Sequence, residues 1–375
     1  MNPKNSTKEI AFLFLKLGII GFGGPAAHIA MMRDEVVIKR KWMSDHHFLD
    51  LVGATNLIPG PNSTEMAIHL GREKGGWKGL ITAGLCFILP AIFITLFFAW
   101  LYKQYGQLPD IQPFIYGIKP AIIAIILSAI FPLAQKSLKN VTLGIFGLLA
   151  LVFSFMDFSE VLLLFGSGFL AVALAYFKNK RIPHTNAFFP FWMLPVSKTL
   201  VSISNLKLFL TFLKIGSILY GSGYVLFAFL DSELVSTGIL SRQVLLDAIS
   251  VGQFTPGPVF SSVTFIGYQI NSWTGAVVST IGVFLPSFLF VAFLNPLVKK
   301  MRNSHLLSVF LDAVNVASIA LIIVVCYKMG KDSIIDWRTI VIAIASLIVT
   351  FGFQKINSVY VVLGSALLGY LLFLI

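Results

Sequence analysis

The stretch NLIPGPNST, residues 56 to 64, returns in altered form as QFTPGPVFSS, residues 253 to 262. Each copy places Pro-Gly-Pro beside hydroxyl and amide side chains. Because proline has no backbone N–H to donate and glycine bends freely, each copy should end one helix and let another begin. The two copies therefore predict an interrupted helix in each half of the chain.

The chain around these two copies has the composition of a membrane protein. Of its 375 residues, 57% are hydrophobic, 12% are charged and 35 are phenylalanine, which a soluble domain could neither expose nor bury. Apolar windows of roughly 17 to 25 residues are long enough to cross a hydrocarbon core of about 30 Å. Such windows lie near residues 8–32, 78–102, 111–134, 140–156, 160–177, 206–230, 274–297, 305–327, 338–353 and 357–375. We therefore expect an all-α polytopic membrane protein with about ten transmembrane helices.

The two halves of the chain repeat one another. FLKLG at 14–18 matches FLKIG at 212–216, and GFGGP at 21–25 matches LYGSG at 219–223. Further matches are Asp50 with Asp247, Pro59-Gly60-Pro61 with Pro256-Gly257-Pro258, and Gly71, Trp77, Gly79 and Pro90 with Gly267, Trp273, Gly275 and Pro286. This pattern predicts a duplicated domain. Its parts are an N-terminal repeat (1–178), a linker (179–205) and a C-terminal repeat (206–375).

The basic residues indicate the side of the membrane that each connection faces. Lysine and arginine gather around residues 33–41, 72–74, 136–139, 178–181 and 299–302. By the positive-inside rule these connections are cytoplasmic, so the net charge of +12 requires no nucleic-acid partner. With five spans in each half, the second repeat is inverted, the linker is cytoplasmic and both termini lie outside. Inverted repeats with broken or re-entrant helices are typical of secondary transporters.

The interrupted helices predict an anion site near the middle of the membrane. Irregular backbone is tolerated in hydrocarbon only where it lines a cavity or is buried in protein. The amide groups at the start of a helix attract anions, and hydroxyl groups add neutral donors. The residues expected at the two breaks are Pro59, Gly60, Pro61, Asn62, Ser63 and Thr64, with Pro256, Gly257, Pro258, Ser261 and Ser262. A tight surface loop is the alternative for an isolated copy, but the symmetry-related pair favours the site.

Glycine-rich segments precede both copies and belong to the same expected site. They contain Gly23, Gly24 and Pro25 in the first half, and Gly221, Ser222 and Gly223 in the second. Glycine allows close approach of the backbone to a ligand, and proline suits the first turn of a new helix. A packing face between helices is the alternative.

Ionisable residues inside apolar spans are costly and mark candidate functional sites. Lys16 and Lys214 occupy equivalent positions in the repeats, as a site for a doubly charged anion would require, or they extend to lipid headgroups. His28 follows GFGGP. Glu65 and His69 lie four residues apart after Pro-Gly-Pro. They are candidates for coupling an ion to transport, or they pair to stabilise the hairpin.

We expect no cofactor and no metal site. His46 and His47 are adjacent and lack further ligands at a useful spacing. The chain has no Gly-x-x-x-x-Gly-Lys-Ser/Thr loop, which argues against direct coupling to ATP.

The paired motifs resemble the chromate ion transporter family in its long, two-domain form. The resemblance rests on FLKLGIIGFGGPAAHIAMMRDE (14–35), NLIPGPNSTEMAIHLG (56–71) and their counterparts in the second half, and covers about 85 to 90 residues at the start of each half. It implies export of chromate, with sulfate as a related dianion, driven by an ion gradient across a bacterial-type plasma membrane. It marks as site residues Gly23, Gly24, Pro25, His28, Pro59, Gly60 and Pro61, with Gly221, Gly223, Pro256, Gly257 and Pro258. Tyr220 and Ser222 depart from the family's Phe-Gly-Gly-Gly pattern.

The expected function is secondary transport of a tetrahedral oxyanion by alternating access, with an antiporter as the expected type. The alternatives are a passive oxyanion channel with the same filter and an importer of sulfate-type anions. An enzyme is not expected, because no nucleophile, metal cluster or carboxylate pair emerges. The expected partners are the oxyanion and the lipid bilayer, with a homodimer as an alternative to a single chain.

Overall fold

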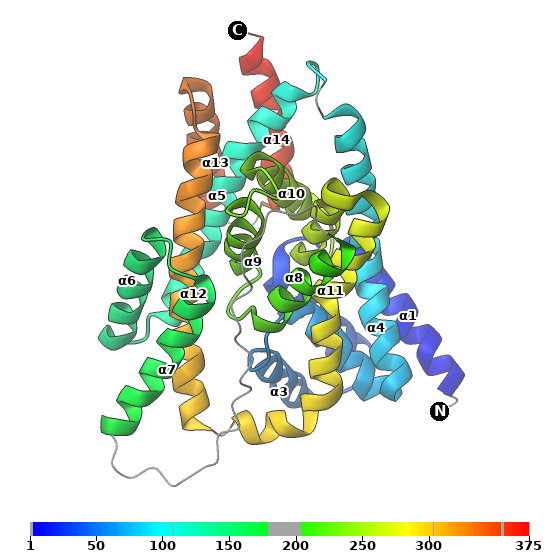
Figure 1. Cartoon of the computed structure of the whole chain (residues 1–375). Helices are drawn as coiled ribbons and strands as arrows, with labels where there is room; N and C mark the ends of the chain where they lie inside the picture. Colours follow the sequence, from blue (N-terminus) through cyan, green and yellow to red (C-terminus); the bar gives the residue numbers. More distant parts are fainter. Residues whose placement is uncertain (1–2, 107, 179–203, 303, 354–355, 375) are drawn as a thin grey trace.

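The fold is built from helices wherever the structure describes the chain. The computed structural model describes residues 3–106, 108–178, 204–302, 304–353 and 356–374, and these hold fourteen α-helices and no strand (Figure 1). The first repeat contains α1 (Pro3–Ile20), α2 (Gly24–Arg33), the π-helix η1 (Asp34–Lys39), α3 (Asp45–Thr55), α4 (Asn62–Tyr105), α5 (Gln112–Ser137), α6 (Val141–Phe155) and α7 (Glu160–Lys178). The second contains α8 (Asn205–Ile218), α9 (Val225–Leu230), the π-helix η2 (Asp231–Val235), α10 (Arg242–Phe254), the 3₁₀ turn η3 (Val259–Ser261), α11 (Ser262–Arg302), α12 (His305–Ser333), α13 (Trp337–Gly352) and α14 (Ser358–Phe373).

The apolar helices match a polytopic membrane protein. Among the described residues, α4, α5, α7, α11 and α12 are long and apolar enough to cross a membrane, and α6, α13 and α14 are shorter apolar helices. Large apolar side chains on these helices face outward, such as Phe93 at 64% exposure and Phe293 at 67%. Lipid tails are the solvent that covers such a surface without cost. The prediction of an all-α polytopic membrane protein with two repeats is confirmed.

The two repeats use the same local signals at equivalent places. Ser44 caps α3 by accepting a hydrogen bond from His47 N, and Ser241 caps α10 by accepting one from Val244 N. Such caps satisfy amide groups that the first turn of a helix leaves without partners. The same element order, with a π-helix after the second helix of each repeat, follows from the duplicated sequence.

The first two helices of each repeat form a hairpin that turns back at the glycine-rich segment. In the first repeat, Gly23 (φ 102°) and Gly24 (φ 78°) adopt positive φ, which glycine tolerates best. The chain then runs back alongside α1, because Lys16 Nζ lies 2.9 Å from Glu35 Oε1 and Arg40 Nη1 lies 3.0 Å from Glu9 Oε1. The window 8–32, counted from its apolar length as one crossing, is therefore a re-entrant hairpin.

A second re-entrant hairpin joins α3 to the first part of α4. It returns to its starting level, since His47 Nε2 lies 3.2 Å from Glu73 Oε2. The long helix α4 then reverses at Gly75 and Gly76, where φ and ψ leave the helical region, and α11 reverses likewise at Asn271 and Ser272.

Small residues make these reversals tight. A Cβ at Gly71 would meet the backbone of Gly79, and a Cβ at Gly267 would meet that of Gly275. The glycines shared by the two repeats therefore mark the places where the two arms of each reversal touch.

The long parts of α4 and α11 lie antiparallel and place the hairpins of the two repeats at opposite ends. Arg72, beside the reversal of α4, donates to the carbonyl of Ala292 at 2.7 Å near the far end of α11. Lys103, near the end of α4, donates to Ser272 Oγ at 2.9 Å at the reversal of α11. The second repeat is thus inverted relative to the first.

The arrangement corrects the expected position of the N-terminus. The N-terminus and the end of α7 lie toward the same end of the molecule, and the C-terminus lies toward the other (Figure 1). The expectation of both termini on one side counts 8–32 and 206–230 as crossings, but both segments turn back. In addition, α8 begins at the end opposite the N-terminus, since Asn271 Nδ2, at the reversal of α11, lies 3.0 Å from Asn205 Oδ1. The predicted linker lies outside the described residues up to residue 203, and the repeat boundaries stay a prediction.

Candidate functional site

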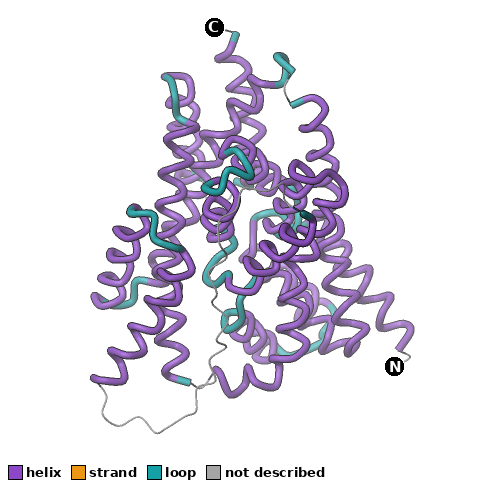
Figure 2. Tube along the Cα trace, viewed as in Figure 1, coloured by secondary structure: helices purple, strands orange, loops and turns teal. Residues whose placement is uncertain are grey.

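The breaks of the two repeats meet each other near the centre of the molecule. The Gly60 N–H donates to the carbonyl of Leu219 at 2.8 Å, and the Gly257 N–H donates to the carbonyl of Gly21 at 2.7 Å. These two bonds occupy equivalent positions, so the Pro-Gly-Pro of each repeat is joined to the glycine-rich segment of the other. Figure 2 shows loop segments between helices in this central region. The sequence predicted four breaks but not that they pair across the repeats.

Each Pro-Gly-Pro leaves free amide groups at the start of the next helix. Thr64 N and Glu65 N donate to the Pro61 carbonyl at 2.8 and 3.0 Å. The N–H groups of Asn62 and Ser63 have no acceptor in the described part of the chain, as is usual for the first turn of a helix. These N–H groups lie where the positive end of the helix dipole attracts negative charge.

The second repeat has the same kind of helix start. The Ser261 N–H donates to the Pro258 carbonyl at 2.9 Å, and no described residue accepts from the N–H groups of Val259 and Phe260. The 3₁₀ turn at this point makes the start of α11 tighter than the start of α4. Two helix starts of inverted direction therefore present amide groups near the meeting point.

Buried hydroxyl groups surround the two helix starts. Ser63, Thr64, Ser261 and Ser262 are at most 2% exposed. Ser261 Oγ accepts a hydrogen bond from Thr95 at 3.2 Å, whereas Thr64 Oγ1 and Ser262 Oγ have no partner among the described residues. Leaving a buried hydroxyl without a partner costs about 1–3 kcal/mol. A ligand oxygen would remove that cost.

Asn62 differs from these hydroxyl residues. Its side chain is partly exposed and donates to Asn56 Oδ1 at 2.8 Å. In this conformation the Asn62 side chain is bonded within the hairpin of α3 and α4, and its backbone amide is the first of α4.

The glycine-rich segments are held by different side chains in the two repeats. His28, 1% exposed, places Nε2 2.9 Å from the Gly21 carbonyl and packs its ring edgewise on Phe87. In the second repeat, Ser318 of α12 donates to the Tyr220 carbonyl at 3.1 Å. Gly221 keeps a positive φ of 98° despite its neighbours Tyr220 and Ser222. The departures from the family pattern therefore preserve the break.

The predicted lysines form equivalent ion pairs. Lys16 Nζ lies 2.9 Å from Glu35 Oε1, and Lys214 Nζ lies 2.6 Å from Glu233 Oε1. The hydrogen bond from Lys16 holds the pKa of the Glu35 carboxyl below its usual range. In this conformation neither lysine is bonded to Pro-Gly-Pro, and their role in anion binding stays a prediction.

Comparison with known proteins supplies the family. The family model described as chromate transporter matches residues 8–172 and 206–370, one match for each repeat. The chain belongs to the chromate transporter family. It is therefore a membrane transporter and not an enzyme, as the sequence predicted.

Relatives of the transporter extend over nearly its whole length. A chromate transport protein of Cupriavidus metallidurans is 32% identical over 98% of this chain and 93% of its own length. A probable chromate transport protein of Synechococcus elongatus is 30% identical over 95% and 92%, and an uncharacterized transporter of Methanocaldococcus jannaschii is 28% identical over 99% and 95%. No solved structure matches the chain.

Glu65 and His69 are both buried in the transporter but do not pair. Glu65 is 0% exposed, and Ser287 Oγ donates to its Oε1 at 3.4 Å. Glu65 Oε2 and both ring nitrogens of His69 have no hydrogen-bond partner in the described part of the chain. The alternative that Glu65 and His69 pair to stabilise the hairpin is therefore wrong. Their role in coupling stays a prediction.

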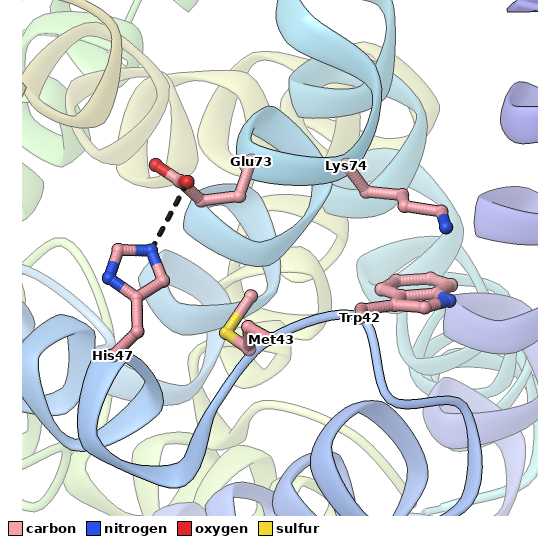
Figure 3. A pocket seen from close by; sticks show the side chains of 5 residues that line it. All are labelled: Trp42, Met43, His47, Glu73 and Lys74. Carbon is pink, nitrogen blue, oxygen red and sulfur yellow. Dashed lines mark hydrogen bonds and ion pairs between the residues drawn. The ribbon is translucent and has the colours of Figure 1, made fainter. Parts of the chain in front are cut away.

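Two cavities lie away from the buried meeting point. The first, of about 130 Å³, lies between the two hairpins of the first repeat, and it is lined by Trp42, Met43, His47, Glu73 and Lys74 (Figure 3). The second, of about 190 Å³, lies between the start of α12 and the residues before the first Pro-Gly-Pro, and includes Asn56, Leu57 and Asp312. The described residues contain no group of three His, Cys, Asp or Glu side chains placed to hold a metal.

Sequence reasoning missed three polar residues at the meeting point. Thr95, Ser287 and Ser318 reach it from long apolar helices, and their partners lie 166, 222 and 98 residues away. Their one available signal was a lone hydroxyl in an apolar span, which is common in membrane helices.

Proposed function

We propose that this chain is a secondary transporter that exports chromate, and sulfate as a related dianion, across a bacterial-type plasma membrane by alternating access. The observation that carries the proposal is the pair of equivalent backbone hydrogen bonds, Gly60 to Leu219 and Gly257 to Gly21. They bring the helix starts of two inverted repeats to one place, in a chain whose relatives include named chromate transport proteins.

The meeting point suits a tetrahedral dianion. The free amides of Asn62 and Ser63 and those of Val259 and Phe260 offer donors from two helix starts. Each helix start carries about half a positive charge, so two of them offset about half of a doubly negative charge without a buried cation. The hydroxyls of Thr64 and Ser262 can then donate to further oxygens of the anion.

A transporter fits this geometry better than the passive channel that the sequence left open. A channel needs a continuous wet path through its filter. Here Pro59, Gly60 and Pro61 are buried, as are Pro256, Gly257 and Pro258, and backbone hydrogen bonds join the repeats across the centre. The anion can reach this point only if the repeats move relative to each other, as alternating access requires.

The charge of the substrate favours export over import. Moving one charge across a membrane potential is worth about 2.3 kcal/mol per 100 mV, so a dianion gains about 4.6 kcal/mol per 100 mV on leaving a cell with a negative interior. A sulfate-type importer would need to overcome this term.

Purified protein in liposomes tests the proposal. We expect uptake of labelled chromate that saturates with concentration and is accelerated by unlabelled chromate or sulfate on the opposite side. Protein-free liposomes give the background, and an imposed potential of each sign gives the preferred direction. Flux that rises linearly with concentration and shows no acceleration from the opposite side would establish a channel instead.

A further inference from the structure

Glu65 is a buried carboxyl group that forms no ion pair with any residue the structure describes. It is 0% exposed, and in the described part of the chain its hydrogen-bond partner is the Ser287 hydroxyl. Tyr220, from the glycine-rich segment of the second repeat, is a titratable neighbour of Glu65, and His69 lies one turn further along α4, where Arg72 is its charged neighbour. Since an unpaired buried charge is very costly, the repeats can close over Glu65 as they do here only when it is neutral, and Glu65 carries a charge only in open conformations that admit water.

The carboxyl group lies directly against the first Pro-Gly-Pro. A Cβ at Gly60 would meet Glu65 Oε1, and would lie 2.6 Å from Ser287 Oγ. Glu65 also belongs to the first turns of α4, whose free amides we propose as anion donors. A dianion bound at this helix start would therefore lie beside the carboxyl group.

The protonation state of Glu65 decides whether that neighbourhood attracts or repels an anion. A carboxylate has only acceptors, so it would repel a dianion, whereas a neutral carboxyl group has one O–H to donate. Glu65 Oε2 is the oxygen without a partner. A proton on Oε2 therefore finds its acceptor in an oxyanion.

We infer that Glu65 is the proton-binding residue of the transporter, and that its neutral carboxyl group donates a hydrogen bond from Oε2 to the bound oxyanion. The inference rests on the proposed function. In an open conformation a proton from water joins the Glu65 carboxylate at Oε2 as the anion binds, and it returns to water when the anion leaves on the other side. Each ligand then strengthens the binding of the other. The proton and the anion are therefore bound to the transporter at the same time and cross the membrane together. Such coupling is cotransport and not the exchange expected from sequence, and the proton–anion pair, with one net negative charge, still gains on export about half of the free energy that the dianion alone would gain.

The second repeat has no carboxyl group at the position equivalent to Glu65. Ser262 occupies the place of Glu65 in the second repeat, and Ile266 occupies that of His69. Ala91 lies beside Gly257 where Ser287 lies beside Gly60. The inverted fold is therefore symmetric in its backbone and asymmetric in its proton chemistry.

Calorimetry of anion binding in two buffers of different ionisation enthalpy tests the inference. Sulfate is the first probe because it does not titrate near neutral pH, and chromate is the second, used above neutral pH. We expect the unmodified protein to take up roughly one proton per anion, with an affinity that falls by up to tenfold per pH unit in the alkaline range. Glu65→Gln keeps a neutral donor, so it should bind the anion with no proton uptake and little pH dependence.

Asp247→Asn is the matched control. Asp247 is another buried carboxyl group, 6% exposed, but it accepts from Tyr102 at 2.7 Å and pairs with Lys119 at 3.3 Å. This variant should take up the proton as the unmodified protein does. Anion binding without proton uptake in the unmodified protein, or unchanged uptake in a folded Glu65→Gln variant, would overturn the inference. If folded, unmodified protein bound neither probe, the proposed function itself would fail.

Discussion

At the residue scale, Gly60 and Gly257 are the positions where a single methyl group should do most damage. Both have positive φ, 136° and 89°, which side-chain-bearing residues rarely adopt. A Cβ at Gly257 would lie 2.9 Å from the Cβ of Ala91, and one at Gly60 would press on Glu65 and Ser287. The backbone conformation alone costs of order 1–3 kcal/mol per residue.

We therefore expect Gly60→Ala and Gly257→Ala each to lower the initial rate of chromate transport at least tenfold, since about 1.4 kcal/mol corresponds to a factor of ten. Gly144→Ala is the control, because nothing lies within 4 Å of a Cβ at that helical position. The measurement is the initial rate in liposomes at equal amounts of folded protein. Equal rates in all three variants would show that the breaks tolerate side chains and do not form a tight site.

The residues that could be predicted from sequence are those with a special backbone. Gly60 and Gly257 could be predicted because glycine and proline are the strongest sequence signals of a break in an apolar helix. Ser287 and Ser318 were not found, since a hydroxyl in an apolar helix looks the same whether it faces a neighbour or a ligand. Lys16 was assigned from its equivalent position in the repeats, but its partner Glu35 depends on a re-entrant turn that sequence did not reveal.

At the element scale, the reversal of α11 carries strain that the reversal of α4 avoids. Ser272 has φ 52° and ψ −141°, a conformation close to that of Gly76 at φ 59° and ψ −144°. For a residue with a Cβ this region costs of order 1–3 kcal/mol. The 2.9 Å hydrogen bond from Lys103 to Ser272 Oγ offsets part of that cost.

Exchanging the two residue types should move stability in opposite directions. Ser272→Gly should raise the thermal midpoint in detergent, and Gly76→Ser should lower it, each through a change of about 0.5–2 kcal/mol. Tryptophan fluorescence during heating measures both midpoints. A lower midpoint for Ser272→Gly would mean that the Lys103 bond outweighs the backbone strain.

The proline breaks themselves belong to this scale. Replacing Pro59 and Pro61 together by alanine lets α3 and α4 extend or fuse, because proline disfavours a helix interior by about 3 kcal/mol relative to alanine. We expect the double variant to insert in the membrane and to lose chromate transport. Ser63→Ala, which removes one hydroxyl and keeps the backbone, should weaken anion binding by about 0.5–1.5 kcal/mol. Normal transport by the inserted double variant would make Pro-Gly-Pro a plain turn.

Sequence predicted the breaks of these elements better than the number of crossings. An apolar segment such as 8–32 has the composition of a span whether it crosses or turns back. The deciding facts are the positive φ angles of Gly23 and Gly24 and the ion pair of Lys16 with Glu35, and both depend on contacts between segments.

At the scale of the whole molecule, the N-terminus and the C-terminus lie toward opposite ends (Figure 1). The basic segment 33–41 lies beside α1, since Arg40 pairs with Glu9, so the positive-inside rule predicts a cytoplasmic N-terminus and an outer C-terminus. With Cys86 and Cys326 replaced, a cysteine at Lys8 should resist an impermeant thiol reagent in intact cells. A cysteine at Asp110, in the exposed connection after α4, should react. Labelling of both would restore the original expectation for the N-terminus.

The central claim is that the oxyanion binds where the breaks of the two inverted repeats meet. Crystals of the transporter grown with selenate, a tetrahedral dianion whose selenium scatters anomalously, test it most directly. We predict an anomalous peak between the helix starts after Pro61 and Pro258, within hydrogen-bond distance of the amides of Asn62 and Ser63. A peak confined to the cavity of Trp42, His47 and Lys74, or to the ion pairs of Lys16 and Lys214, with none at the meeting point, would contradict the account.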